Sequence, residues 1–127
     1  MALTLADLTG KTVGACVSGG LDSRTIAKVM VEAGVNVVAF SADLGQPDEK
    51  DINDIKKRMA PCGVDTVIVD LKDAMAEACF QVVEAQAMYD GGDWTSTGIA
   101  RAVTVRGLIP ERKKRKCTVL VHGATGR

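Results

Sequence analysis

Short continuous apolar runs alternate along the chain with longer stretches of helical periodicity. The first run closes the segment 11–17 and breaks at Ser18-Gly19-Gly20, which is typical of a buried strand entering a tight loop. In the stretch 26–33, apolar residues recur at i, i+3, i+4 and i+7, the spacing of one helix face. Gly34 then stands where a helix would stop.

The same alternation continues to the last residues. Pro61 with Gly63 should end a helix, the segment 90–93 is expected as a flexible break, and Pro110 should lie near the end of the last helix. The further elements that we expect are strands at 35–41, 66–69 and 117–121 and helices at 52–59, 71–88 and 99–109.

Strands that alternate with helices predict an α/β fold with a doubly wound parallel sheet, whose helical crossovers cover both faces. Ligands on such sheets bind at the carboxyl ends of the strands. The loops 18–23, 42–46 and 122–127 each follow a predicted strand. The fold prediction therefore brings these loops together at one edge of the sheet.

Composition narrows the class of protein. The 127 residues suffice for one domain, 1–127, and its core should rest on aliphatic side chains because aromatic residues make up only 3%. Lys plus Arg and Asp plus Glu both number 16, and this zero net charge argues against binding of nucleic acid through overall charge. The basic run 112–116 could form a local nucleic-acid patch, but we interpret it as the solvated end of a helix.

Cysteine usage and hydropathy bear on the cellular location. The four cysteines form no C-x-x-C pair, and the single histidine, His122, leaves too few ligands for a typical metal site, so reduced thiols are expected. No apolar run approaches the roughly 20 residues of a spanning helix. The segment 1–9 lacks the basic and apolar regions of a signal peptide. Together these features predict a cytoplasmic protein without a membrane partner.

The first loop, Ser18-Gly19-Gly20-Leu21-Asp22-Ser23, has the composition of an anion cradle. Paired glycines let backbone N–H groups approach a phosphate closely, and the following helix adds the positive end of its dipole. Asp22 could hold Mg²⁺, cap the helix, or do both. The alternative is an ordinary strand-to-helix turn capped by Asp22 or Ser23, because the loop matches neither common nucleotide motif.

The other two loops give weaker signals when each is taken alone. Asp43, after the second strand, could contact a ribose, but an acidic residue there is more often part of a turn. The segment 122–127 repeats the glycine pattern and adds a hydroxyl and a cation, which suits an anionic ligand or a frayed terminus. Trp94 could stack on a base or serve as a packing anchor.

Taken together, the loops resemble a known family. The segment 18–23 resembles the S-G-G-x-D-S/T loop of the N-type ATP pyrophosphatases, which cleave ATP between the α and β phosphates. The segments 40–49 and 122–127 are similar, in order and spacing, to argininosuccinate synthase, and 87–89 and 99–101 also fit. The resemblance spans nearly the whole chain and implies the family's Rossmann-like, adenine nucleotide alpha hydrolase-like domain.

The resemblance implies an ATP-dependent carbon–nitrogen ligase of arginine biosynthesis. In this family ATP adenylates the ureido oxygen of citrulline, pyrophosphate leaves, and the amine of aspartate displaces AMP. The chemistry asks for a pyrophosphate cradle, Mg²⁺ and close orientation of two small substrates, so no general base is assigned. The implied ligands are therefore ATP, Mg²⁺, citrulline and aspartate, and the family forms homo-oligomers.

Site residues are carried over by position. Thr125 would bind aspartate, and Asp22 would hold Mg²⁺. Asp93 falls where the family contacts citrulline, and so does Thr97 or Gly98, depending on how the loop is aligned. The residues assigned to ATP are Cys16, Val17, Ser18, Gly19, Gly20, Leu21, Asp22, Ser23, Arg24, Ala42 and Gly123.

The chain also departs from the family pattern. Val17 replaces an aromatic residue, Arg24 replaces a small hydroxyl residue, and Asp93 stands where the family has a tyrosine. The family continues with a second domain that supplies further substrate contacts and most of the oligomer interface, so we expect this chain to be inactive alone. The alternatives are a stand-alone ATP-binding module, another N-type pyrophosphatase such as a tRNA-thiolation enzyme, or a degenerate domain without a ligand.

Overall fold

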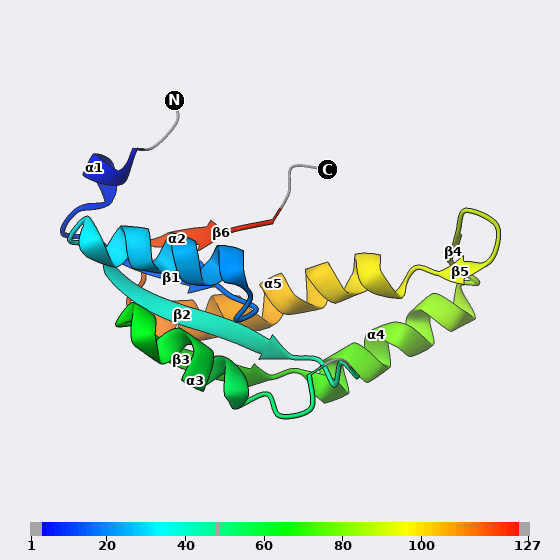
Figure 1. The fold of residues 1–127 in the computed structure, drawn as a ribbon. Helices are drawn as coiled ribbons and strands as arrows, with labels where there is room; N and C mark the ends of the chain where they lie inside the picture. Colours follow the sequence, from blue (N-terminus) through cyan, green and yellow to red (C-terminus); the bar gives the residue numbers. More distant parts are fainter. Residues whose placement is uncertain (1–3, 48, 125–127) are drawn as a thin grey trace.

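The computed structural model describes residues 4–47 and 49–124, which form a four-stranded parallel sheet and flanking helices (Figure 1). The strand order in the sheet is β3-β2-β1-β6. Parallel pairing joins β1 to both β2 and β6, and β2 to β3. The strands are β1 (Thr12–Cys16), β2 (Asn36–Asp43), β3 (Asp65–Asp70) and β6 (Val119–His122).

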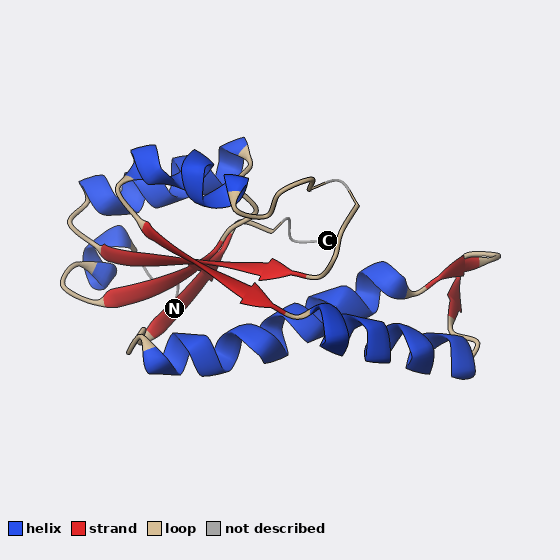
Figure 2. Ribbon diagram, turned by 90° about the horizontal axis from the view of Figure 1, so that it is seen from below, coloured by secondary structure: helices blue, strands red, loops and turns tan. Residues whose placement is uncertain are grey.

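Helices cover both faces of this sheet, as the prediction of a doubly wound fold requires (Figure 2). On one face lie α2 (Leu21–Glu32) and α3 (Asp54–Met59), which connect β1 to β2 and β2 to β3. On the other face lie α4 (Lys72–Glu84) and α5 (Ser96–Lys114), which lead from β3 to β6. The chain therefore reverses its winding direction at β1, between β2 and β6.

The core lies mainly between the sheet and the α2 and α3 layer. Val13, Ala39 and Met59 are fully buried there, next to Ile55 at 2% exposure. A smaller cluster on the opposite face contains Phe40, which is fully buried. Aliphatic residues dominate both clusters, as the composition predicts.

Most of the predicted elements are confirmed, and two helix stops follow the expected chemistry. Gly34 and Gly63 adopt the left-handed backbone, with φ of 78° and 77°, which glycine tolerates best. Between α3 and Gly63 the chain forms a short 3₁₀ turn, η1 (Ala60–Cys62). A first helix, α1 (Leu5–Leu8), was not predicted.

The structure departs from expectation at two places in the segment 71–94. The helix expected at 71–88 ends at Glu84, because Gln86 takes the left-handed conformation with φ of 49°. The break at 90–93 is the turn of a hairpin formed by β4 (Met88–Tyr89) and β5 (Asp93–Trp94). Helix α5 continues for four residues beyond Pro110, to Lys114, so the proline lies near its end as expected.

Helices α4 and α5 pack along one another and extend beyond the sheet with the hairpin at their far end, and we call this unit, residues 72–114, the arm (Figure 1). Gly107 permits the close packing, since a Cβ at that position would collide with Leu71. Among the described residues, no helix has the length and apolar character needed to cross a membrane.

Candidate functional site

A cavity of about 420 Å³ lies at the carboxyl ends of β1, β2 and β6. This volume is within the range of small-ligand sites, roughly 300–1,000 Å³. The cavity adjoins β1, where the winding of the sheet reverses, which is the usual ligand position in open α/β sheets. Its lining residues are Cys16, Val17, Ser18, Gly20, Leu21, Asp22, Ser23, Phe40, Ala42, Thr104, Leu108, His122, Gly123 and Ala124.

The lining contains most of the residues that the sequence assigned to ATP. Every one of them except Gly19 and Arg24 borders the cavity. The prediction that the loops after β1, β2 and β6 meet at one edge is therefore confirmed for residues up to Ala124. Thr125, assigned to aspartate, lies outside the described residues.

The loop after β1 forms an open helix start. Gly20 occupies the N-cap of α2, and no side chain caps it. The Ser23 hydroxyl instead donates a 3.1 Å hydrogen bond back to the carbonyl oxygen of Gly20. The interpretation that Asp22 or Ser23 caps an ordinary turn is therefore wrong, and the first N–H groups of α2 keep their capacity to bind an anion.

The two glycines of this loop have different structural roles. Gly19 needs its lack of a side chain, because its φ is 74° and a Cβ there would lie 2.9 Å from Nε of Arg58. Gly20 has φ of −73°, which any residue adopts. A Cβ at Gly20 would meet within 4 Å only the Ser18 hydroxyl, at 3.5 Å. Since Gly20 borders the cavity, a longer side chain there would occupy ligand space.

The floor of the cavity joins β1 to β6 at the pair Cys16 and His122. His122 Nδ1 accepts a 3.3 Å hydrogen bond from the N–H of Ala124. Burial raises the pKa of the Cys16 thiol above its ordinary value, so the thiolate is disfavoured near neutral pH. This thiol therefore lines the cavity as a small apolar group, not as an activated nucleophile.

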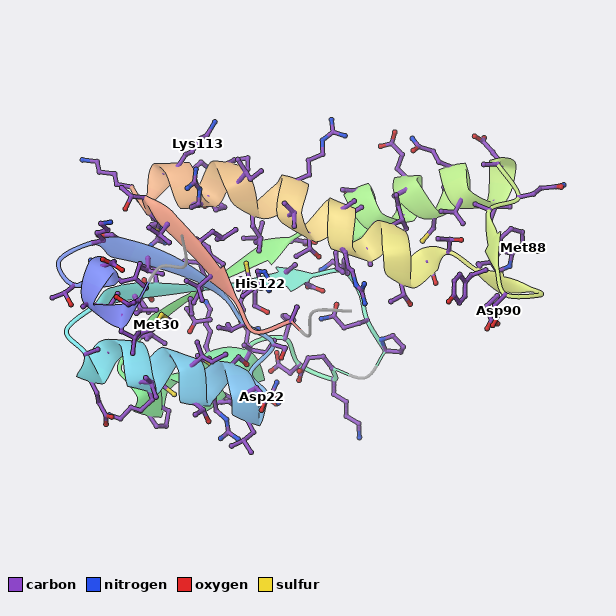
Figure 3. All side chains as sticks on the ribbon, turned by 90° about the horizontal axis from the view of Figure 1, so that it is seen from above. Asp22, Met30, Met88, Asp90, Lys113 and His122 are labelled. Carbon is purple, nitrogen blue, oxygen red and sulfur yellow. The ribbon has the colours of Figure 1, made fainter. Side chains whose placement is uncertain are left out.

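Asp22 and His122, labelled in Figure 3, belong to α2 and β6 and line the same cavity from these two elements. Within residues 4–47 and 49–124, Asp22 is the only carboxylate that lines the cavity. No group of three or more His, Cys, Asp and Glu side chains arranged to hold a metal occurs among the described residues. A metal at this site would thus depend on oxygen atoms of a bound ligand in addition to Asp22.

Asp43 is a turn residue, as the more general reading of its position suggested. Its Oδ1 accepts a 3.0 Å hydrogen bond from the N–H of Gly45, and its Oδ2 lies 3.0 Å from Nζ of Lys72. Lys72 also pairs with Asp70, at 3.1 Å. Asp43 fixes the loop after β2, while its neighbour Ala42 borders the cavity.

Five lining residues were not assigned from the sequence. Thr104 and Leu108 come from α5 and are four residues apart, so they lie on the same face of the helix. Phe40 looks like an ordinary core residue, because it is in the middle of an apolar strand and fully buried. His122 and Ala124 flank the assigned Gly123, and the glycine-rich pattern of that segment was the signal for them.

The remaining assigned residues lie elsewhere. Arg24 does not border the cavity, and its Nε is buried without a hydrogen-bond partner among the described residues. Asp93 and Thr97 belong to the arm, in β5 and in the first turn of α5. Met88 and Asp90, labelled in Figure 3, mark the hairpin at the far end of the arm from His122. The citrulline assignment of Asp93 and Thr97 stays a prediction.

The doubly wound sheet, with a cavity at the carboxyl ends of its strands, defines a Rossmann-like α/β domain. A solved structure supports this class: NMN synthetase from Francisella tularensis superposes with a TM-score of 0.61 at 14% sequence identity. The match covers 84% of this chain and 43% of that one.

The family model of the arginosuccinate synthase N-terminal HUP domain matches residues 12–127, and the chain belongs to this family. Argininosuccinate synthase of Syntrophobacter fumaroxidans is 38% identical over 119 residues. Argininosuccinate synthases of Pelobacter propionicus and Agrobacterium fabrum are 35% and 34% identical over 120 residues. The matches cover 92% of this chain, which spans 29% of the length of these relatives.

Proposed function

We propose that this chain is the ATP-binding domain of an argininosuccinate synthase, a ligase that joins citrulline and aspartate and cleaves ATP to AMP and pyrophosphate. The observation that carries the proposal is the uncapped glycine N-terminus of α2, which opens into a cavity of about 420 Å³. Family membership supports the same function. The proposal includes the cytoplasm as the place of action, with which the four free cysteines agree.

The lining of the cavity suits the two parts of a nucleotide. Gly20, Ser18 and the first turn of α2 offer N–H and hydroxyl donors for phosphate oxygens. Cys16 and Ala42, which are partly exposed, offer apolar surface for a base. Mg²⁺ fits this arrangement because it is commonly held by one or two carboxylates together with phosphate oxygens. Asp22 would hold it, and the ion would offset negative charge on the phosphates.

Turnover is proposed to require the rest of the family's protein. Citrulline and aspartate must be held next to the nucleotide, and Asp93 and Thr97 do not border the cavity. The family's homo-oligomer is likewise part of the proposal. This chain corresponds to 29% of the length of its relatives. Formation of argininosuccinate by the isolated chain from citrulline, aspartate and Mg·ATP would contradict this requirement.

The first experiment is calorimetric titration of the chain with Mg·ATP, next to Gly20→Val. Backbone geometry at Gly20 accepts valine, and the side chain would occupy the phosphate cradle, so we expect affinity to fall by about a hundredfold. Ala76→Val, on the exposed face of α4, is the matched control and should bind as the parent does. If the folded parent does not bind Mg·ATP, or if folded Gly20→Val binds equally well, the proposed function is wrong.

A further inference from the structure

Arg58, on α3, lies next to Gly19 in the loop 18–23, which we call the phosphate loop. Arg58 does not border the cavity. An ideal Cβ on Gly19 would be 2.9 Å from Nε and 3.2 Å from Nη2 of this guanidinium. The same Cβ would be 3.3 Å from Cγ2 of Ile55, one turn earlier on α3. The left-handed turn at Gly19 is thus packed against one face of α3.

The guanidinium is itself held in place. Nη2 of Arg58 lies 2.5 Å from Oε2 of Glu49, and the two side chains are 38% and 20% exposed. Nε of Arg58 is buried and has no hydrogen-bond partner among the described residues. A buried donor without a partner costs free energy, so the surrounding structure must hold it there. Glu49 pairs with this guanidinium, and the turn at Gly19 lies against it.

Glu49 connects this contact to the other side of the cavity. Its N–H donates a 3.4 Å hydrogen bond to the carbonyl oxygen of Gln46. The Gln46 side chain accepts from the N–H of Leu44 at 2.9 Å and donates to the carbonyl oxygen of Ala42 at 3.5 Å. Since Ala42 borders the cavity, these contacts link the loop after β2 to the loop after β1.

We propose that Arg58 is a positioning residue for nucleotide binding: held by Glu49, it fixes the turn at Gly19 and thereby aims the N–H groups of the phosphate loop into the cavity. The inference rests on the proposed function, because the ligand that these groups would meet is the phosphate chain of ATP. The side chain acts through the loop and touches no ligand. Its loss should therefore weaken recognition of phosphates and leave recognition of the nucleoside intact.

The test compares the dissociation constants of Mg·ATP and of adenosine for the parent, Arg58→Met and Lys57→Met. We expect Arg58→Met to bind Mg·ATP about tenfold more weakly, because a displaced anion cradle loses hydrogen bonds to charged oxygens, and to bind adenosine within about twofold of the parent. Lys57 precedes Arg58 on α3 and, within the part of the chain that the structure describes, pairs only with Asp54, so Lys57→Met should change neither constant. A general loss of structure would weaken the binding of Mg·ATP and of adenosine together.

A second variant covers the case in which Arg58→Met does not fold. Glu49→Gln removes the charge that holds the guanidinium and keeps the length of the side chain, so the same selective loss should be about threefold. Hydrogen exchange of the amides at 18–23, measured without ligand, should become faster in both variants.

The outcomes separate the two proposals. If the parent binds Mg·ATP and folded Arg58→Met binds it equally well, or loses adenosine in parallel, the role of Arg58 is wrong and the proposed function stands. If the parent binds no Mg·ATP, the proposed function fails and the role in nucleotide binding fails with it.

Discussion

The two phenylalanines of this chain mark a contrast between the sheet and the arm. Phe40, on β2, is fully buried and borders the cavity, whereas Phe80, on α4, is 71% exposed. Tyr89 and Trp94 in the hairpin are 70% and 43% exposed. The candidate site therefore rests on the part of the molecule with a packed interior, and the arm keeps its largest apolar side chains at the surface.

The contrast shows how differently the two regions hold their shape. In the sheet, each strand pairs along its length and buries side chains against helices. In the arm, two helices pack mainly on each other and on the sheet face near Leu71, and the hairpin has two residues per strand. The candidate site thus lies where strand pairing and buried packing fix the backbone, which is what a precise binding geometry requires.

The largest expected difference is between the two phenylalanines themselves. Phe40→Ala removes a fully buried ring and should lower the free energy of unfolding by about 3–5 kcal/mol. Phe80→Ala removes a mostly exposed ring and should change it by less than about 0.5 kcal/mol. Urea unfolding followed by circular dichroism measures both. Equal losses would show that α4 buries Phe80 in solution and would remove the contrast.

Two glycines with left-handed backbones give a sharper comparison. Gly91, in the hairpin turn, has φ of 92° and open space around it, so Gly91→Ala should cost about 1 kcal/mol of backbone strain. Gly19 adds a collision with Arg58 to the same strain, so Gly19→Ala should cost about 2–3 kcal/mol. Both values come from denaturant unfolding. A Gly19→Ala variant as stable as Gly91→Ala would mean that Arg58 is not packed against the loop.

A smaller effect is expected at the junction of sheet and arm. Hydrogen bonds from the backbone N–H and the ammonium group of Lys72 lower the pKa of Asp70 below its ordinary value. A carboxyl whose pKa is lowered by folding contributes stability above its unfolded pKa, about 4, and loses it as pH falls through the folded value. Asp70→Asn should therefore be slightly less stable than the parent at pH 6.

The pH profile of Asp70→Asn supplies the control for that prediction. Thermal unfolding at pH 6 and at pH 3 should show a midpoint difference between parent and variant that shrinks on acidification. A difference that stays constant over this range would mean that the lowered pKa of Asp70 does not contribute to folding.

The smallest expected effect concerns the residues of the arm that were assigned to citrulline. Asp93 and Thr97 lie outside the cavity lining. The substitutions Asp93→Ala and Thr97→Ala should therefore each change the affinity for Mg·ATP by less than about twofold. Calorimetry with the parent as reference measures this. A tenfold loss of affinity in either variant would show that the nucleotide extends to the arm. Nucleotide binding could then no longer be assigned to the sheet region alone.

The sequence predicted the sheet side of the molecule better than the arm. Buried parallel strands produce short apolar runs between turn residues, and the segments at 11–17 and 35–41 show this pattern plainly. The strands of the hairpin contain two exposed residues each, which is too short for any periodicity. Helix α5 runs through Gly107, although glycine has a low helix propensity. The absence of a side chain there lets Leu71 pack closely, and such a tertiary contact cannot be predicted from propensity.

The candidate site likewise contains residues that the sequence predicted and residues that it did not. Residues of the three loops could be predicted, since glycine and hydroxyl side chains after a strand have a chemical reason to be there. Thr104 and Leu108 could not, because their helix reaches the cavity only through the packing of α5 on the sheet. Arg58 gave no signal either, since a basic residue on a short helix looks like a solvated one until its contact with Gly19 is known.

Helix α5 also fixes the distance between two of the residues discussed above. Thr97 and Thr104 are seven residues apart, which is two turns, so they lie on the same face and about 10 Å apart along the helix axis. Pro110 follows both and leaves this stretch regular. Because Thr104 borders the cavity, Thr97 lies about 10 Å along the helix axis from this part of the lining. The spacing of two threonines on one helix thus fixes the separation between the cavity and the beginning of α5.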